Sequence, residues 1–231
     1  MKRFQAMTLI CCGVLCAAAL SVKAATVLVD PAASWVGFMN VSETPQNGGG
    51  YVFGSSWGTS DLTAVFSGST LALGPNSVND PSNFWYTPAG GPGSVGNKTM
   101  DANMYVETNG VYTGQNLTFS GTVLSNTLVG STNQLGNGWT SVAFIKDFAP
   151  DYSSNVSVTV PLTAGAFSVS LNTVNDPARH IQYGFETVGP DVWATDVAPF
   201  GNIQVAAVPE PAIMTFAGLA VVCLSSIRRR R

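Results

Sequence analysis

The sequence predicts an all-β fold: a single antiparallel β-sandwich of jelly-roll type, flanked by an N-terminal signal peptide and a C-terminal transmembrane helix. Three observations predict it. The central region is rich in Gly, Ser, Thr, Asn and Val and poor in Leu, Glu, Lys and Arg, so strand and turn formers outnumber helix formers. Apolar and polar residues alternate with the two-residue period of a strand. Turn-forming clusters separate about ten such segments at even spacing, as in sandwiches and barrels.

Residues 1–24 have the features of a cleaved secretory signal. Two basic residues precede an apolar run over residues 7–20, a length typical of a signal-peptide core but short for a bilayer span of about 20 residues. Small or short side chains at the last and third-last positions predict cleavage between Ala24 and Ala25. A permanent N-terminal anchor is the less favoured alternative.

Strand patterns fill the region that follows. Alternation is clearest over residues 156–162, where four apolar side chains share one face, and over 167–171 and 181–185. Weaker strand patterns lie at residues 35–41, 61–66, 69–73, 100–106, 117–124, 141–146 and 202–205. Turn clusters lie at residues 47–50, 87–96 and 130–138. The region shows no fixed-period repeat, so a β-helix is the less favoured fold.

The chain ends in three adjoining elements. A Pro-containing motif occupies residues 208–212, with Val208, Pro209, Glu210 and Pro211 at its centre. An apolar segment follows at residues 213–227, which as a helix would span about 23 Å of the roughly 30 Å bilayer core. Four arginines close the chain: Arg228, Arg229, Arg230 and Arg231. Basic clusters stay on the cytoplasmic side, so the region between the two termini is expected outside the cytoplasm.

This tail resembles the PEP-CTERM sorting domain of bacterial proteins that are processed by exosortase, a membrane cysteine protease-transpeptidase. Pro209-Glu210-Pro211, the membrane segment and the arginine run carry the resemblance, which covers residues 208–231. It implies an exosortase-type protease as partner, transient membrane anchoring, removal of the tail near the motif, and delivery to the cell surface or its exopolysaccharide matrix. It implies no particular activity.

The domain between the targeting segments, residues 25–207, has an unusual composition. All four cysteines lie outside it, so it holds no disulfide, thiol nucleophile or cysteine metal site. It contains 12 acidic residues and only three Lys or Arg residues, a net charge of −9. Nucleic acid is a poor partner for such a surface, whereas cations, especially calcium, or neutral glycans suit it better.

The end of the domain resembles the last two strands of carbohydrate-binding-module jelly rolls. The resemblance is carried by Gln182-Tyr183-Gly184-Phe185-Glu186 and by Phe200-Gly201-Asn202-Ile203-Gln204-Val205. It implies a jelly roll with a glycan as ligand.

Aromatic residues offer a candidate ligand site. Phe84, Trp85 and Tyr86 are consecutive and precede a Gly- and Pro-rich loop. Because adjacent strand residues point to opposite faces, one of Trp85 and Tyr86 is expected to face solvent, where its ring could stack on a sugar. The alternative is that these rings belong to the core.

Catalytic motifs are present only as literal matches. Residues 54–58 match G-x-S-x-G, with Ser56 as nucleophile and His180 as base, but the following residues read as strand rather than the required helix. Residues 91–96 match G-x-G-x-x-G without the strand and helix of a dinucleotide site, and predict a loop. The glutamates that could form a glycosidase pair are few: Glu43, Glu107 and Glu186.

Calcium is the one metal that the composition favours, although no cofactor is required. Oxygen ligands could come from Asp147, Asp151, Asn155, Asp191 and Asp196, which show no EF-hand spacing. The leading interpretation is a non-catalytic, exported protein of the cell surface or extracellular polysaccharide, acting as a glycan-binding or structural module. The alternatives are a secreted polysaccharide or ester hydrolase and a calcium-stabilised adhesive protein.

Overall fold

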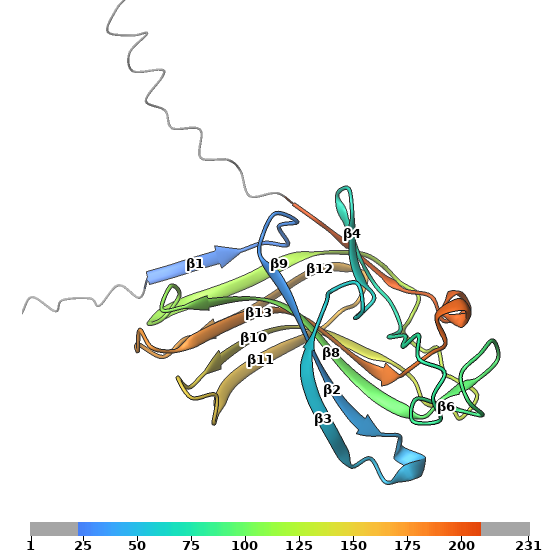
Figure 1. The fold of residues 1–231 in the computed structure, drawn as a ribbon. Coiled ribbons are helices and arrows are strands. Elements are labelled where there is room, and N and C mark those ends of the chain that lie inside the picture. The colour runs from blue at the N-terminus through green and yellow to red at the C-terminus, as the bar shows by residue number, and fades with distance from the viewer. Residues whose placement is uncertain (1–22, 209–231) are drawn as a thin grey trace, which may run out of the picture.

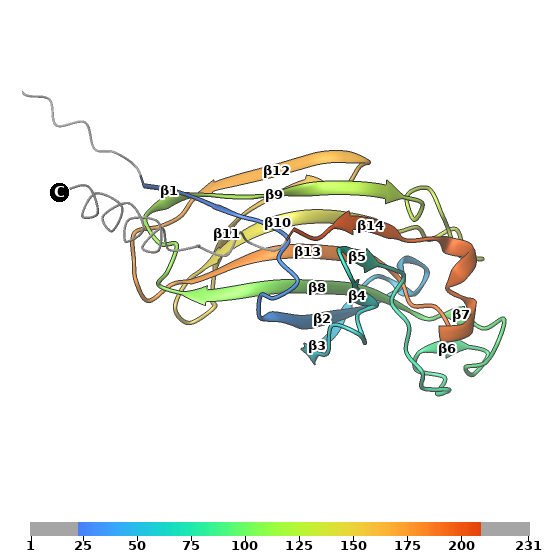
Figure 2. The ribbon, with the colours of Figure 1, turned by 90° about the horizontal axis from the view of Figure 1, so that it is seen from above.

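The computed structural model describes residues 23–208, which form two six-stranded β-sheets packed face to face (Figure 1). Sheet A contains β1 (Lys23–Val27), β4 (Ala64–Ser67), β5 (Thr70–Leu73), β9 (Gln115–Asn126), β12 (Gly165–Asn172) and β14 (Ile203–Ala206). Sheet B contains β2 (Trp35–Glu43), β3 (Tyr51–Trp57), β8 (Lys98–Asn109), β10 (Thr140–Phe148), β11 (Asn155–Pro161) and β13 (His180–Pro190). At one end of the sandwich, β6 (Tyr86–Thr87) pairs with β7 (Val95–Gly96) (Figure 2). The expected all-β architecture is confirmed.

The pairing of β9 explains how sheet A is completed. β12 pairs with residues 116–123 of β9, β1 pairs in parallel with residues 115–119, and β14 pairs antiparallel with residues 123–126. Because a strand has only two edges, β1 and β14 share the edge of β9 opposite β12, one after the other. Beyond β14 the sheet continues to β5 and β4. In sheet B the order is β11-β10-β13-β8-β2-β3, and all neighbours are antiparallel.

The core lies between the sheets and follows the two-residue period of the strands. In β8, Met100 and Met104 are buried against the opposite sheet, and in β13 Phe185 is. The ring of Phe119 in sheet A lies 5.3 Å from that of Phe185 and 5.4 Å from that of Phe167. Each fully buried apolar side chain contributes roughly 1.5–3 kcal/mol, so this aromatic cluster stabilises the contact between the sheets.

Every segment expected to be a strand coincides with one in the structure, but some boundaries differ. The segment expected at residues 61–66 begins as a strand only at Ala64, because residues 61–63 form a turn in which Thr63 has φ +53°. β3 was not expected because Gly54 and two serines interrupt its apolar alternation. β1 was not expected because it spans the predicted cleavage site at Ala24 and Ala25.

The two targeting segments fall largely outside the described residues. The signal-peptide core, the sorting motif from Pro209 onward, the membrane segment 213–227 and the four terminal arginines all lie there. Within residues 23–208, no helix has the length and apolar character needed to cross a bilayer.

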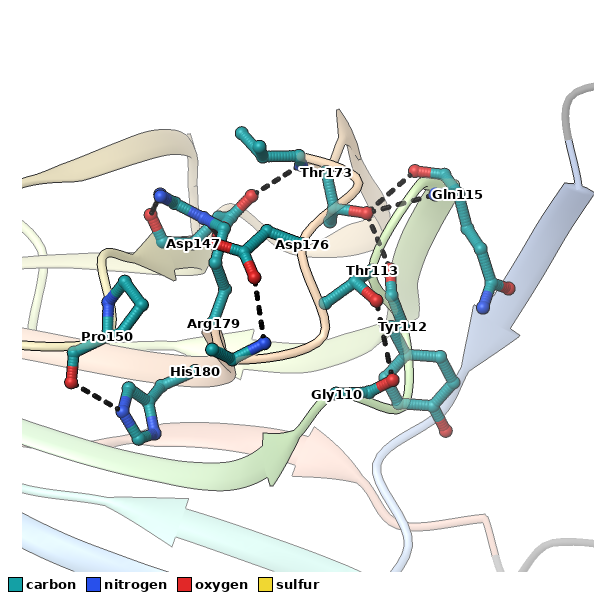
Figure 3. Close-up of polar contacts among 12 residues, drawn as sticks. Gly110, Tyr112, Thr113, Gln115, Asp147, Pro150, Thr173, Asp176, Arg179 and His180 are labelled. Atoms are coloured by element: carbon teal, nitrogen blue, oxygen red, sulfur yellow. Dashed lines mark hydrogen bonds and ion pairs between the residues drawn. The ribbon is translucent and has the colours of Figure 1, made fainter.

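A buried ion pair fastens the loop between β12 and β13 to the rest of the sandwich (Figure 3). Arg179 Nε donates to Asp147 Oδ1, and Arg179 Nη2 donates to the Asp147 carbonyl over 2.8 Å. The other carboxylate oxygen of Asp147 accepts the Val174 N–H over 2.7 Å. Thr173, one residue earlier, accepts the Gln115 N–H through its hydroxyl over 3.1 Å. The loop is therefore held by β10 on one side and by the start of β9 on the other.

Replacing Asp147 with Ala should lower the free energy of unfolding by about 3–5 kcal/mol, because it leaves the largely buried Arg179 guanidinium without its carboxylate. Urea denaturation followed by tryptophan fluorescence measures this change. Asp61→Ala is the control, because Asp61 is exposed, and it should change stability by no more than about 0.5 kcal/mol. Equal effects of the two substitutions would contradict the role of the ion pair.

Candidate functional site

The solvent side of sheet B carries a pocket of about 550 Å³. Its polar lining comes from five strands of sheet B and from the loop between β10 and β11. Alternate residues of each strand point away from the core and so reach this side. The lining consists of Phe38, Asn40, Ser56, Asn103, Tyr105, Glu107, Lys146, Phe148, Tyr152 and Gln182. We call the solvent side of sheet B around this pocket the sheet-B face; it includes Asp101 and Glu186, which bond to lining residues.

A chain of hydrogen bonds crosses the sheet-B face from β2 to β10. Asn40 donates to one carboxylate oxygen of Asp101 over 3.1 Å, and Asn103 donates to the other over 2.7 Å. Lys146 Nζ then donates to Asn103 Oδ1 over 2.8 Å and to Glu186 over 2.7 Å. Four neighbouring strands thus contribute to one network, which fixes the orientation of side chains that would otherwise be mobile in solvent.

Asp101 is the most perturbed acid of this network. Burial raises the pKa of its carboxyl group, and the negative charge of Glu186 raises it further. The hydrogen bonds from Asn40 and Asn103 and the charge of Lys146 act in the opposite direction. Asp101 therefore binds a proton more readily than an exposed aspartate.

A second cluster surrounds Glu107 at the other side of the pocket. Gln182 donates to Glu107 over 2.6 Å, and the Tyr152 hydroxyl donates to it over 3.0 Å. Burial raises the pKa of Tyr152 to about 12, with a further contribution from the hydrogen bond to Glu107. The Tyr152 ring also stacks on His180, with 4.2 Å between the ring centroids. Tyr152 is thereby held at the edge of the pocket although about half of its surface is exposed.

Four aromatic side chains give the sheet-B face an apolar component. Phe38, Tyr105 and Phe148 are partly buried, and Tyr152 is exposed. Partly exposed rings beside fixed amide and carboxylate groups can stack on the C–H face of a sugar ring while the polar groups bond its hydroxyls. The arrangement suits a polyhydroxylated ligand better than a purely apolar one.

The prediction that Trp85 or Tyr86 faces solvent, where its ring could stack on a ligand, is wrong. Trp85 is 9% exposed and Tyr86 is fully buried, and both belong to the core. The Tyr86 hydroxyl donates to the Val78 carbonyl over 2.6 Å, and the Trp85 indole donates to Asp80 over 3.2 Å. The expectation assumed regular strand alternation, but β6 holds only Tyr86 and the residue after it, and Trp85 precedes the strand. Of the three consecutive aromatics it is Phe84 that is exposed.

The five expected calcium ligands do not converge. Asp147 is paired with Arg179, Asp151 accepts the Ser153 hydroxyl over 2.7 Å, and Asn155 begins β11. Asp191 and Asp196 line a different cavity at the end of the sandwich. In the part of the chain that the structure describes, no group of three or more His, Cys, Asp or Glu side chains could hold a metal ion.

The literal catalytic motifs are not assembled either. Ser56 lies within β3 rather than at a strand-to-helix turn, and the His180 ring contacts Asn109 Oδ1 at 2.8 Å. The other ring nitrogen of His180 contacts the Pro150 carbonyl at 3.2 Å (Figure 3). Residues 91–96 form a loop that ends in β7, as expected.

Of the three glutamates, only two share a face. Glu107 and Glu186 lie on the solvent side of sheet B, together with Asp101, which the sequence reasoning did not single out. Glu43 instead pairs with Lys98 over 3.2 Å. The alternation of residues 101–107 was the available signal, since Asp101, Asn103, Tyr105 and Glu107 occupy one face of a strand.

Asp191 is a second acid with a raised pKa and is almost completely buried. Burial raises its pKa to about 7, against the opposing effect of the Lys98 N–H, which donates to Asp191 Oδ1 over 3.0 Å. Its second oxygen has no hydrogen-bond partner among residues 23–208.

The titration of Asp191 should appear in the stability of the protein. A carboxyl group whose pKa is higher in the folded state binds more protons when folded, so its contribution is present below about pH 4 and is lost as the pH rises to about 7. Asp191→Asn keeps the acceptor for the Lys98 N–H and cannot ionise. Relative to this variant, the wild type should lose up to about 4 kcal/mol between pH 4 and pH 8, as measured by denaturant unfolding at several pH values. A difference that does not vary with pH would contradict the assignment.

Comparisons with known proteins do not add a family to this description. No protein-family model, curated protein or solved structure matches the chain.

Proposed function

We propose that this chain is an exported, non-catalytic β-sandwich protein whose sheet-B face binds a polysaccharide at the cell surface or in its extracellular matrix. The observation that carries the proposal is the pocket on sheet B, where four partly exposed or exposed aromatic rings border a network of fixed polar groups. Open faces of this kind can accept a chain of sugar residues laid across the strands.

The strand order supports a jelly-roll assignment for the sandwich. The run β5-β14-β9-β12 in sheet A faces the run β8-β13-β10-β11 in sheet B. Successive strands from β8 to β14 cross between the sheets except at the β10–β11 hairpin, which is the connectivity of two nested Greek keys. β1, β2, β3 and β4 extend the two sheets beyond these eight strands.

Charge supports a neutral or basic glycan over an acidic one. The sheet-B face presents Asp101, Glu107 and Glu186 against the single ammonium group of Lys146. An acidic polysaccharide would meet like charge at this face and over a domain with a net charge of −9.

Export and sorting form the second part of the proposal and depend on the two targeting segments. Cleavage between Ala24 and Ala25 would leave residues 25–27 paired with residues 117–119 of β9, so β1 would persist in shortened form. At the other end, the Val208 N–H donates to the Val29 carbonyl over 2.9 Å. The sandwich thus extends to the first residue of the sorting motif, which is consistent with a folded cargo followed directly by its processing signal.

A polysaccharide hydrolase is the second candidate, favoured by the closeness of Asp101 to Glu186 and the raised pKa of Asp101. Glycoside hydrolysis requires two carboxyl groups, one of which donates a proton to the leaving group. Release of reducing sugar that is abolished by Glu186→Gln, with binding retained, would favour this candidate. Binding without turnover would favour the non-catalytic module.

Binding should depend on the aromatic rings of the sheet-B face. We expect the full chain, purified in detergent micelles, to be retarded in affinity electrophoresis by neutral polysaccharides such as β-glucan or mannan but not by alginate. Tyr105→Ala and Tyr152→Ala should each weaken binding about tenfold, because each removes a stacking surface. Leu124→Ala is the control, because Leu124 is an exposed apolar residue of sheet A. Retardation that is unaffected by both tyrosine substitutions would place the glycan elsewhere or refute the proposal.

Processing should be visible in the mass of the protein recovered from the cell surface. The mature product is expected to begin at Ala25 and to end near Pro209, because both targeting segments are removed. Intact-mass spectrometry and terminal peptide mapping measure both ends. An intact chain recovered from the cytoplasm would refute export.

A further inference from the structure

β6 and β7 lie at one end of the sandwich (Figure 2). A second cavity is lined by residues at this end, none of which belongs to the pocket on sheet B. It has a volume of about 570 Å³, and three loops form it. They are the loop that leads into β7, the connection between β9 and β10, and the segment that follows β13. Gly93 joins two of them by donating its N–H to Asp196 over 2.6 Å. We call this cavity the end pocket.

Two buried side chains of the end pocket each carry a polar atom without a partner. Asn133 Oδ1 accepts the N–H groups of Leu135 and Asn137, both over 3.0 Å, which fixes the amide so that its Nδ2 is the unpartnered donor. Asp191 Oδ1 accepts the Lys98 N–H, which leaves Oδ2 as the unpartnered acceptor. Both side chains are more than nine-tenths buried. Both residues line the end pocket, so an unpartnered donor and an unpartnered acceptor belong to two side chains of its wall.

The remaining unpartnered groups lie around the same cavity. Over residues 23–208, the buried side-chain polar atoms without partners belong to Asn76, Asn133, Trp139 and Asp191 only. The Asn76 carbonyl accepts the N–H of Val192, and the Trp139 ring packs on that of Phe200 with 4.9 Å between centroids. Val192 and Phe200 both line the end pocket. Because buried polar groups in folded proteins are nearly always bonded, their concentration at one end indicates a place that a polar ligand completes.

The donors and acceptors that line the end pocket indicate the chemical class of its ligand. A metal ion would satisfy Asp191 and Asp196 but would meet the amide donor of Asn133, and an anion would meet both carboxyl groups. Hydroxyl groups both donate and accept, so they suit the amide and the carboxyl groups together. Pro199 and Phe200 add an apolar wall for the C–H face of a ring. We propose that the end pocket binds a single sugar residue or a comparable cyclic polyol.

The close packing of β7 against Asp191 requires a glycine at position 96. A Cβ atom on Gly96 would lie 1.9 Å from the Asp191 carbonyl oxygen and 2.5 Å from its Oδ1. Only glycine therefore allows β7 to lie against Asp191 and bring the neighbouring Ser94 into the cavity lining. This proposal is independent of the sheet-B face, since no residue lines both pockets.

Two nearly isosteric substitutions test the end pocket. Asn133→Asp keeps Oδ1 and exchanges the free donor for an acceptor, and Asp191→Asn keeps Oδ1 and exchanges the free acceptor for a donor. With the full chain in micelles, saturation-transfer-difference NMR should detect glucose, galactose, mannose or N-acetylglucosamine. Each variant should lower the affinity for the bound sugar at least about tenfold. Leu124→Ala is the control and should leave this affinity unchanged, because Leu124 is an exposed residue of sheet A that lines neither pocket. Circular dichroism checks that the variants are folded.

The possible outcomes separate the two proposals. Retention of polysaccharide without binding of any monosaccharide would overturn the end pocket and leave the sheet-B face intact. Monosaccharide binding that both pocket variants preserve would also overturn it. Stabilisation by calcium that Asp191→Asn abolishes, with no response to sugars, would refute the ligand class. Monosaccharide binding without polysaccharide retention would support the end pocket and count against the sheet-B face.

Discussion

The antiparallel pairing of β8 with β13 is the constraint on which both the core and the sheet-B face depend. Eleven residue pairs fix the register of these two strands at the centre of sheet B. On one side of this ladder Met104 faces the opposite sheet beside Phe185, and on the other side Tyr105 lies opposite Gly184. A Cβ atom on Gly184 would lie 2.1 Å from the Met104 carbonyl oxygen, so glycine keeps the pairing close. A slip by one residue would exchange the two faces and bury the polar network while exposing the core.

The few basic side chains of this acidic domain are engaged in ion pairs. Between residues 25 and 207, Lys98 pairs with Glu43, Lys146 with Glu186 and Arg179 with Asp147. All three Lys and Arg residues of this range are therefore engaged in ion pairs, and the remaining acidic groups have no Lys or Arg partner in an ion pair. Arg179 stabilises a loop, whereas Lys146 organises the sheet-B face. The same pairs that hold the structure together thus leave a surface that repels anions.

The fold could be predicted from the sequence more fully than the site. Strands β11, β12 and β13 follow from strict alternation, because a half-buried strand needs one apolar face. The position of Trp85 and Tyr86 could not be predicted, because an irregular segment at the end of the sandwich buries adjacent residues together. The alternation of Asp101, Asn103, Tyr105 and Glu107 was visible, but the partners Lys146 and Gln182 come from strands that are distant in sequence. The end pocket depends on three loops, whose proximity no local pattern encodes.

The direction of β14 has a consequence for how the molecule would be presented. The chain leaves the end pocket at Phe200, runs through β14 and reaches Val208 beside Val29. A domain tethered through residues after Val208 would therefore stand with its loop-built end distal to the attachment point. In that orientation the end pocket would lie far from the attachment point, and the long strands would separate the two.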